Sequence, residues 1–203
     1  DLAYYRQTGR GVSIQWLNLS PTQANSLQQR LMFLARPENA RYRYEYFTNN
    51  CATKVRDILD ETLEGQLKNQ MTSSSLGNTY RSESERLAWP ATWMLLGFDL
   101  GMNSDGDIPL NRWQDAFVPM RLAQSLSEAT LSSGKALVIA EQVVLPNKVA
   151  SPPNELPDWS IQATLVGLVL AGLFFISSKK ETFFNALCVI FWFVSGLIGT
   201  ALF

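Results

Sequence analysis

Two long apolar runs at the C-terminal end constrain this chain more than any other feature. Residues 161–178 and 182–203 are separated by a short turn that holds Lys179, Lys180 and Glu181. As helices the runs would measure about 27 Å and about 33 Å, which suits the apolar thickness of a bilayer. We therefore expect two transmembrane helices over residues 159–203, with Trp159 in the interfacial belt. A buried helical hairpin in a soluble protein is the alternative.

The lysines between the two runs also predict an orientation. Short loops rich in Lys and Arg stay in the cytoplasm, so residues 1–158 would lie on the opposite side, in the periplasm of a Gram-negative cell. This predicts a multi-pass protein of the bacterial inner membrane. Residues 146–158 are rich in proline and would form a stiff linker that reaches at most about 40 Å. The linker would keep a domain made of residues 1–145 close to the bilayer.

Composition narrows the possible functions. The formal net charge is −1 and no basic stripe is visible, which argues against nucleic acid as a partner. The chain has two cysteines and no histidine. Cys188 falls inside the second apolar run, so we expect no disulfide with Cys51. The chain starts at Asp1 without an initiator methionine, and we interpret it as an interior piece of a longer protein.

The pattern of residues 1–145 predicts a mixed α+β domain. Strands are expected over residues 10–19 and 42–47, and either one buried strand or a pair of short strands over residues 136–145. A helix capped by Ser20, with Pro21 at its first position and Gln23 at the third, should run to about residue 34. Further helices are expected over 51–63 with Gly65 as the terminating residue, from a capping box at 82–85 through a kink at Pro90, and near residues 111 and 119. Segments 66–80 and 97–109 are expected to be loops.

Cys51 is the main candidate for chemistry. It follows the predicted strand over 42–47 and opens the predicted helix over 51–63. A thiol on the first turn of a helix meets unpaired N–H groups and the positive end of the helix dipole, which favour thiolate, the nucleophilic form. The backbone N–H groups of Cys51 and Ala52 could stabilise an oxyanion. A cysteine is also a common packing residue, and this alternative stays open.

The segment around Cys51 resembles the periplasmic domain of Lnb-type proteins, a bacterial lipoprotein N-acyltransferase family. The residues that carry the resemblance are Tyr42, Tyr44, Phe47, Asn50, Cys51, Thr53, Arg56 and Asp57. Two further segments also fit, Leu17 to Gln23 and Trp113 to Pro119. The cysteine at a helix start is similar to permuted papain-like proteins, including the lecithin–retinol acyltransferase group.

The resemblance implies an α+β fold, the C-terminal portion of a permuted papain-like thiol domain followed by a transmembrane helical bundle. It implies that Cys51 carries a fatty acyl chain from a phospholipid, as a thioester, to the N-terminal amine of a lipoprotein. Asn50, Ala52, Thr53 and Arg56 would support the site. The catalytic histidine would come from an upstream segment, and neither a metal nor a cofactor is expected. A cell-envelope amidase or peptidase and a non-catalytic binding module anchored in the membrane are the alternatives.

Other polar residues give weaker signals. The segment Asn103 to Asp107 looks like a cation loop, but an EF-hand counted from Asn103 would need glycine at Ile108 and glutamate at Gln114. An Asx-rich turn is the better interpretation. Four further residues are either ion-pair partners, lipid headgroup contacts or solvated surface, namely Arg81, Arg86, Asp99 and Asp105.

Overall fold

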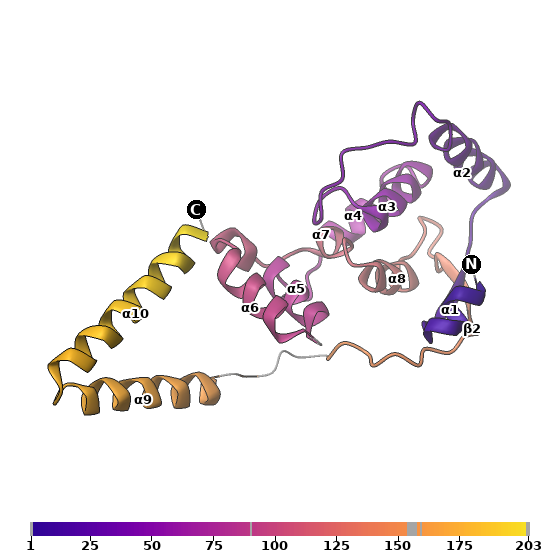
Figure 1. Ribbon diagram of the computed structural model, residues 1–203. Helices are drawn as coiled ribbons and strands as arrows, with labels where there is room; N and C mark the ends of the chain where they lie inside the picture. Colours follow the sequence, from indigo (N-terminus) through magenta and orange to yellow (C-terminus); the bar gives the residue numbers. More distant parts are fainter. Residues whose placement is uncertain (1, 90, 154–157, 159, 202–203) are drawn as a thin grey trace.

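The computed structural model describes residues 2–89, 91–153, 158 and 160–201. Within these residues the chain is mostly helical, with a two-stranded antiparallel sheet and two apolar helices at the C-terminal end (Figure 1). Pro90 and Trp159, for which a kink and an interfacial position are expected, lie outside the described residues.

The N-terminal half begins with helix α1, Leu2–Thr8, and strand β1, Val12–Leu17. Helix α2, Pro21–Leu34, starts as predicted, because Ser20 and Gln23 form the expected capping box and Pro21 occupies the first turn. Helix α3, Cys51–Thr62, then begins directly at the cysteine. The remaining helices of the domain are α4, Gln66–Thr72; α5, Tyr80–Ala88; α6, Thr92–Gly101; the 3₁₀ turn η1, Ser104–Asp107; α7, Arg112–Asp115; and α8, Pro119–Glu128.

Strand β2, Val138–Leu145, closes the domain by pairing with β1. The register places Gln15 opposite Glu141 and Trp16 opposite Ala140. The expected buried strand over 136–145 is therefore present but mostly exposed: Ile139 and Val143 are 63% and 65% accessible. Among the described residues the sheet has only these two strands, so little protein is available to cover the apolar side chains on its surfaces.

Four other expectations about the domain are wrong in whole or in part. Residues 42–47 form no strand; they make a turn with a single bridge between Glu45 and Asn49, because no neighbouring strand pairs with them among the described residues. The segment 66–80, expected to be a loop, contains α4, and the segment 97–109 contains the end of α6. The capping box of α5 also lies one turn earlier than expected, at Thr79 and Ser82.

The core is formed where α3, α4 and α8 meet. Its buried side chains include Leu59, Leu63, Leu67, Leu122 and Leu126, together with Leu137, the residue directly before β2. This packing explains α4: Leu67 and Met71 are four positions apart, so they share one helix face, and both are at most 3% exposed. A smaller core lies beside the first, built on Leu110, Phe117 and Val118.

Helix α3 ends in a Schellman motif, in which the first residue after the C-cap is usually glycine. Here that residue is Glu64, and glycine follows it as Gly65. The N–H of Gly65 bonds the carbonyl of Asp60, and the N–H of Glu64 bonds that of Glu61. Glu64 has φ 55° and Gly65 has φ 84°. Glu64 is thus a residue with a Cβ held in the left-handed region, which costs about 1–2 kcal/mol.

Replacing Glu64 with glycine should therefore stabilise the domain. Relief of the left-handed backbone outweighs the greater freedom of glycine in the unfolded chain, and we expect the free energy of unfolding to rise by about 0.5–1 kcal/mol. Denaturant unfolding measures it. Gly65→Ala is the matched control and should lower stability by about 1 kcal/mol; an unchanged or lowered value for Glu64→Gly would contradict the assignment.

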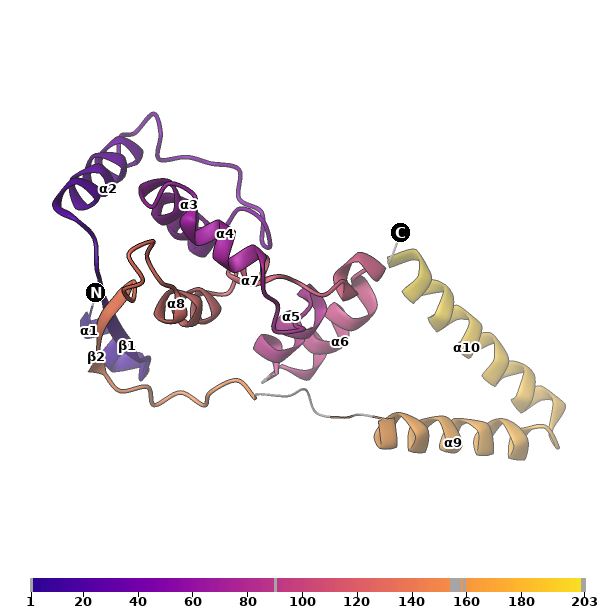
Figure 2. The same ribbon diagram turned by 180° about the vertical axis from the view of Figure 1, so that it is seen from behind.

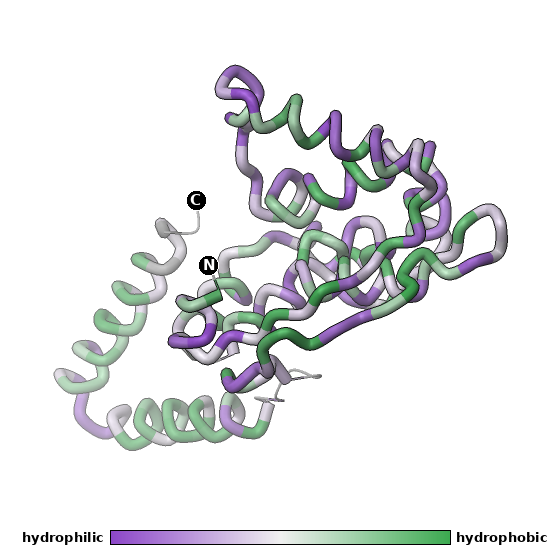
Figure 3. The backbone as a smooth tube through the Cα atoms, turned by 90° about the vertical axis from the view of Figure 1, so that its right-hand side faces the viewer, coloured by the Kyte–Doolittle hydropathy of each residue, from purple (hydrophilic) through white to green (hydrophobic). Residues whose placement is uncertain are grey.

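The C-terminal helices are α9, Ser160–Ser177, and α10, Glu181–Ala201. They stand apart from the rest as a V-shaped pair, seen from both sides in Figures 1 and 2. In Figure 3 both are apolar along their length, with a hydrophilic turn between them. Phe174 of α9 packs edge-on against Phe184 and Phe191 of α10.

Helix α9 is long and apolar enough to cross a membrane. Its mean hydropathy is 2.0 and only 6% of it is buried by protein. Within α10 the apolar stretch Glu181–Leu197 is shorter. A core hairpin of a soluble protein would be buried, so the exposure of α9 argues against that alternative. Residues 146–153, the described start of the linker, contain neither helix nor strand.

Candidate functional site

Asn50 fixes the start of α3. It is 6% exposed, and its side-chain oxygen accepts a hydrogen bond from the N–H of Thr53 at 3.0 Å. In return the hydroxyl of Thr53 accepts one from the N–H of Asn50 at 2.8 Å. The side-chain NH₂ of Asn50 donates to the carbonyls of Tyr46 at 2.8 Å and Phe117 at 2.9 Å. One buried amide thus ties the helix start to the turn before it and to the segment after α7.

Cys51 occupies the first helical position and its side chain is exposed. The next two residues, Ala52 and Thr53, are buried at 5% and 0% exposure. Within the described part of the chain, the backbone N–H groups of Cys51 and Ala52 donate to no protein acceptor. An accessible sulfur beside two unpaired donors is an arrangement that can hold negative charge on an oxygen attached to the carbon that the sulfur attacks.

Arg56 contacts Trp113 of α7 and its neighbour Asp57. It is 7% exposed and packs its guanidinium 3.9 Å from the ring centre of Trp113. It pairs with Asp57 at 2.6 Å and donates to the carbonyl of Trp113 at 2.5 Å. Of the predicted supporting residues, the structure therefore places Asn50, Ala52 and Thr53 beside Cys51. Arg56 instead anchors the side of α3 to α7.

The tyrosines before Cys51 form an exposed surface rather than a core. Tyr42, Tyr44 and Tyr46 are 43%, 59% and 46% accessible. The ammonium of Lys54 lies 5.0 Å from the ring centre of Tyr42, and Val55, one turn after Cys51, is 51% exposed. The segments on either side of Cys51 therefore expose aromatic and aliphatic side chains next to the charged groups of Arg43 and Glu45.

An aromatic cluster packs next to the turn that precedes Cys51. The ring centre of Phe47 lies 4.6 Å from that of Tyr80, with the rings tilted, and 5.3 Å from that of Phe117, in an edge-to-face arrangement. Tyr46 also lies 4.9 Å from Phe47. Burial raises the pKa of both Tyr46 and Tyr80 above its usual range, so their hydroxyls stay protonated at neutral pH. The cluster joins α5 to the segment that carries the cysteine.

Asn50→Ala should lower the free energy of unfolding by far more than the loss of a helix cap alone would. Removal of the cap costs about 1 kcal/mol, and leaving two carbonyls without their buried donor adds about 1–3 kcal/mol. We expect the free energy of unfolding to fall by about 2–4 kcal/mol in denaturant titrations. Asn111→Ala is the control, because the Asn111 side chain forms the same kind of capping box at the start of α7 but holds no further carbonyls among the described residues. This variant should lower the free energy of unfolding by about 1 kcal/mol. Equal costs for the two variants would contradict the role of Asn50.

The sequence interpretation missed a buried charge network in α5 and α8. Glu83 is 1% exposed and accepts hydrogen bonds from two arginines, Arg86 at 2.6 Å and Arg121 at 2.7 Å. Burial alone would raise the pKa of Glu83, but the two guanidinium groups outweigh it and hold the pKa below its usual value. Asp115 lies beside the network, 3.8 Å from Arg121, and its burial raises its pKa.

The weaker candidates are connectors between elements. Arg81 pairs with Asp107 at 2.7 Å and donates to the carbonyls of Phe98 and Met102, so it joins α5 to η1 and the end of α6. Asn103 donates to the carboxylate of Asp105 at 3.0 Å, as expected of an Asx-rich turn. The described residues contain no cluster of three or more His, Cys, Asp or Glu side chains that could hold a metal.

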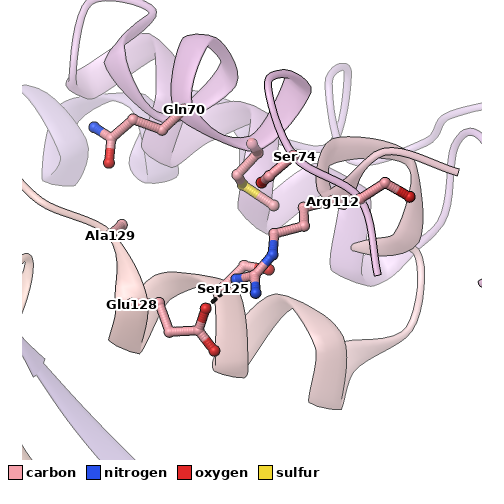
Figure 4. Close-up of a pocket in the computed structure, with 8 residues that line it drawn as sticks. Gln70, Ser74, Arg112, Ser125, Glu128 and Ala129 are labelled. Carbon is pink, nitrogen blue, oxygen red and sulfur yellow. Dashed lines mark hydrogen bonds and ion pairs between the residues drawn. The ribbon is translucent and has the colours of Figure 1, made fainter. Parts of the chain in front are cut away.

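A cavity of about 290 Å³ between α4, α7 and α8 offers little chemistry (Figure 4). Arg112 reaches toward Glu128 and pairs with it, which leaves neither charge free. Ser74 and Ser125 line the cavity, but serine is a weak nucleophile without a base and none of the lining residues is a histidine. Cys51 does not line this cavity.

Comparison with known proteins defines the class of the N-terminal part. Residues 2–94 match the family model described as the Lnb N-terminal periplasmic domain. The resemblance suggested by the residues around Cys51 is thus confirmed at the level of this domain, and no individual member of the family is identified. Neither the curated proteins nor the solved structures contain a match to the chain. With the candidate span in α9, the match indicates association with a membrane of the bacterial envelope.

Proposed function

We propose that this protein is a membrane-bound acyltransferase that moves a fatty acyl chain from a phospholipid, through a thioester on Cys51, to the N-terminal amine of a lipoprotein. The observation that carries the proposal is the exposed thiol at the first position of α3, beside two N–H groups with no protein acceptor. The Lnb domain match and the candidate span add support, because both substrates reside in a membrane.

The chemistry divides into two balanced steps. The sulfur of Cys51 attacks the ester carbonyl of the phospholipid, and the N–H groups of Cys51 and Ala52 stabilise the oxyanion. The carbon–oxygen ester bond breaks, and the lysophospholipid leaves as an alcohol after taking up the proton of the thiol. The free amine of the lipoprotein then attacks the thioester. An amide forms, the carbon–sulfur bond breaks, and the amine proton returns to the sulfur.

The proton transfers need a base that these 203 residues do not supply as histidine. We propose that a histidine from an upstream segment fills this role, within a permuted papain-like domain of which residues 1–145 are the C-terminal portion. In this arrangement the protein is a multi-pass component of the bacterial inner membrane. Residues 1–158 are periplasmic, residues 146–158 are the linker and residues 159–203 are two membrane helices.

The acceptor distinguishes this proposal from its alternatives. The protein, as its gene encodes it, is reconstituted with phospholipid labelled in its acyl chains and with a diacylated lipopeptide that has a free N-terminal cysteine. We expect labelled triacylated lipopeptide and lysophospholipid, and no product when the lipopeptide amine is acetylated. Labelled free fatty acid alone, or cleavage of a peptidoglycan peptide, would favour a hydrolase. Absence of all these products would favour a binding module.

A further inference from the structure

Helix α6 is apolar on all sides although it lies at the surface of the domain. Its sequence from Thr92 to Gly101 holds a single charged residue, Asp99. The helix packs against α5, and Leu95 is its one side chain that is only 7% exposed among those the structure describes. A helix that is apolar on most sides is typically buried in a protein core or in a membrane. We therefore expect the exposed face of α6 to contact an apolar neighbour.

The outward face is a stripe of large apolar side chains. Trp93, Leu96 and Leu100 follow at intervals of three and four residues, so they project from one side of α6. They are 76%, 51% and 56% exposed. A contiguous patch of this kind is typical of a membrane or partner contact, and tryptophan prefers the boundary between water and lipid.

A basic hollow lies at the end of α5, the helix against which α6 packs. It has a volume of about 850 Å³, and its wall includes Trp89, Met120, Pro152 and three arginines, Arg10, Arg86 and Arg121. No acidic side chain lines it. Arg86 and Arg121 both pair with Glu83, and Arg121 also lies 3.8 Å from Asp115. The net positive charge of the hollow therefore comes from Arg10, which is exposed. Its charge complements anionic lipid headgroups.

The linker limits how far this surface can be from a bilayer. Pro152 lines the hollow, and α9 begins at Ser160. The intervening chain spans about 25 Å as polyproline II and about 29 Å at most when fully extended. If α9 spans the membrane, the hollow and α6 stay within reach of its surface. This proximity favours lipid over a soluble partner as the neighbour of the stripe.

We propose that α6 is a membrane-contact helix that inserts Trp93, Leu96 and Leu100 into the interface of an anionic bilayer, while the basic hollow binds lipid headgroups. The helix holds the domain against the membrane in a fixed orientation. This contact does not depend on acyl transfer at Cys51, because it uses a different helix and different side chains.

Accessibility of a spin label tests the insertion. The full chain carries Cys51→Ser and Cys188→Ala, with a nitroxide attached at Leu96→Cys, and is reconstituted in bilayers of phosphatidylcholine and phosphatidylglycerol. The control label is at Ser133→Cys, in the exposed turn before β2. We expect the label at position 96 to be relaxed more by oxygen than by a water-soluble nickel chelate, and the label at 133 to show the reverse. Equal nickel accessibility at both positions would overturn the proposal.

Two further measurements define the occupant. Lowering the phosphatidylglycerol content, or introducing Arg10→Gln, should raise the nickel accessibility at position 96 severalfold, whereas Arg43→Gln on the exposed turn before Cys51 should leave it unchanged. No response to anionic lipid or to Arg10→Gln would overturn the headgroup role of the hollow. Dipolar broadening between labels at position 96 would identify a second copy as the occupant and overturn the bilayer contact.

Discussion

Cys51→Ala should abolish acyl transfer while leaving the fold in place. The side chain is exposed, so its loss leaves no cavity and should change stability by less than about 0.5 kcal/mol. Removal of a nucleophile that forms a covalent intermediate should lower the rate of lipopeptide acylation by at least about 10³-fold. The rate is measured with the labelled phospholipid and the lipopeptide substrate described above.

Cys188→Ala is the matched control for this loss. Cys188 lies in the apolar helix α10 and is half-buried, so its removal should leave the acylation rate within about twofold of wild type. Circular dichroism of both variants separates loss of chemistry from loss of fold. A Cys51→Ala protein that still acylates the lipopeptide would exclude a nucleophilic role for this thiol.

A large loss of stability is expected when Glu83 is replaced. Glu83→Gln keeps the shape of the side chain but leaves Arg86 and Arg121 without the carboxylate that both contact. Loss of one partner from a buried ion network costs about 3–5 kcal/mol, and denaturant unfolding measures it. The control is Glu128→Gln at the edge of the domain, where the carboxylate is 46% exposed and the cost should stay below about 1 kcal/mol.

The cost of Glu83→Gln should also depend on pH. The pKa of Glu83 is lowered in the folded protein, so its stabilising contribution is complete above the unfolded value of about 4.3 and is lost as the pH falls through the folded pKa. Wild type and variant should therefore converge in stability at acid pH. A difference that stays constant from neutral to acid pH would contradict the charge network.

Local patterns predicted local structure well. The capping box at Ser20, the start of α3 at Cys51 and the helical nature of both apolar runs depend on neighbours within one or two turns, and the structure confirms them. The residues that hold the thiol in place, Asn50 and Thr53, also belong to such a local motif.

Features that depend on distant partners were not predictable in the same way. The segment 42–47 has the alternation of a strand, but a strand requires a neighbour, and the described residues provide none. The charge network joins Glu83 to Arg121 across 38 positions, and no spacing rule within one helix indicates that pairing. The match over residues 2–94 names the domain, whereas the reaction remains a proposal built on the geometry at Cys51.

Mass spectrometry of the cysteine-containing peptides can detect the proposed thioester on Cys51 itself. The protein, as its gene encodes it, is incubated with phospholipid in the absence of an acceptor, quenched with acid and digested. We expect a fatty acyl mass on the peptide that contains Cys51, released by neutral hydroxylamine and transferred when lipopeptide is added before quenching. Acylated lipopeptide formed without any such adduct, or an adduct confined to another residue, would contradict the proposed thioester mechanism.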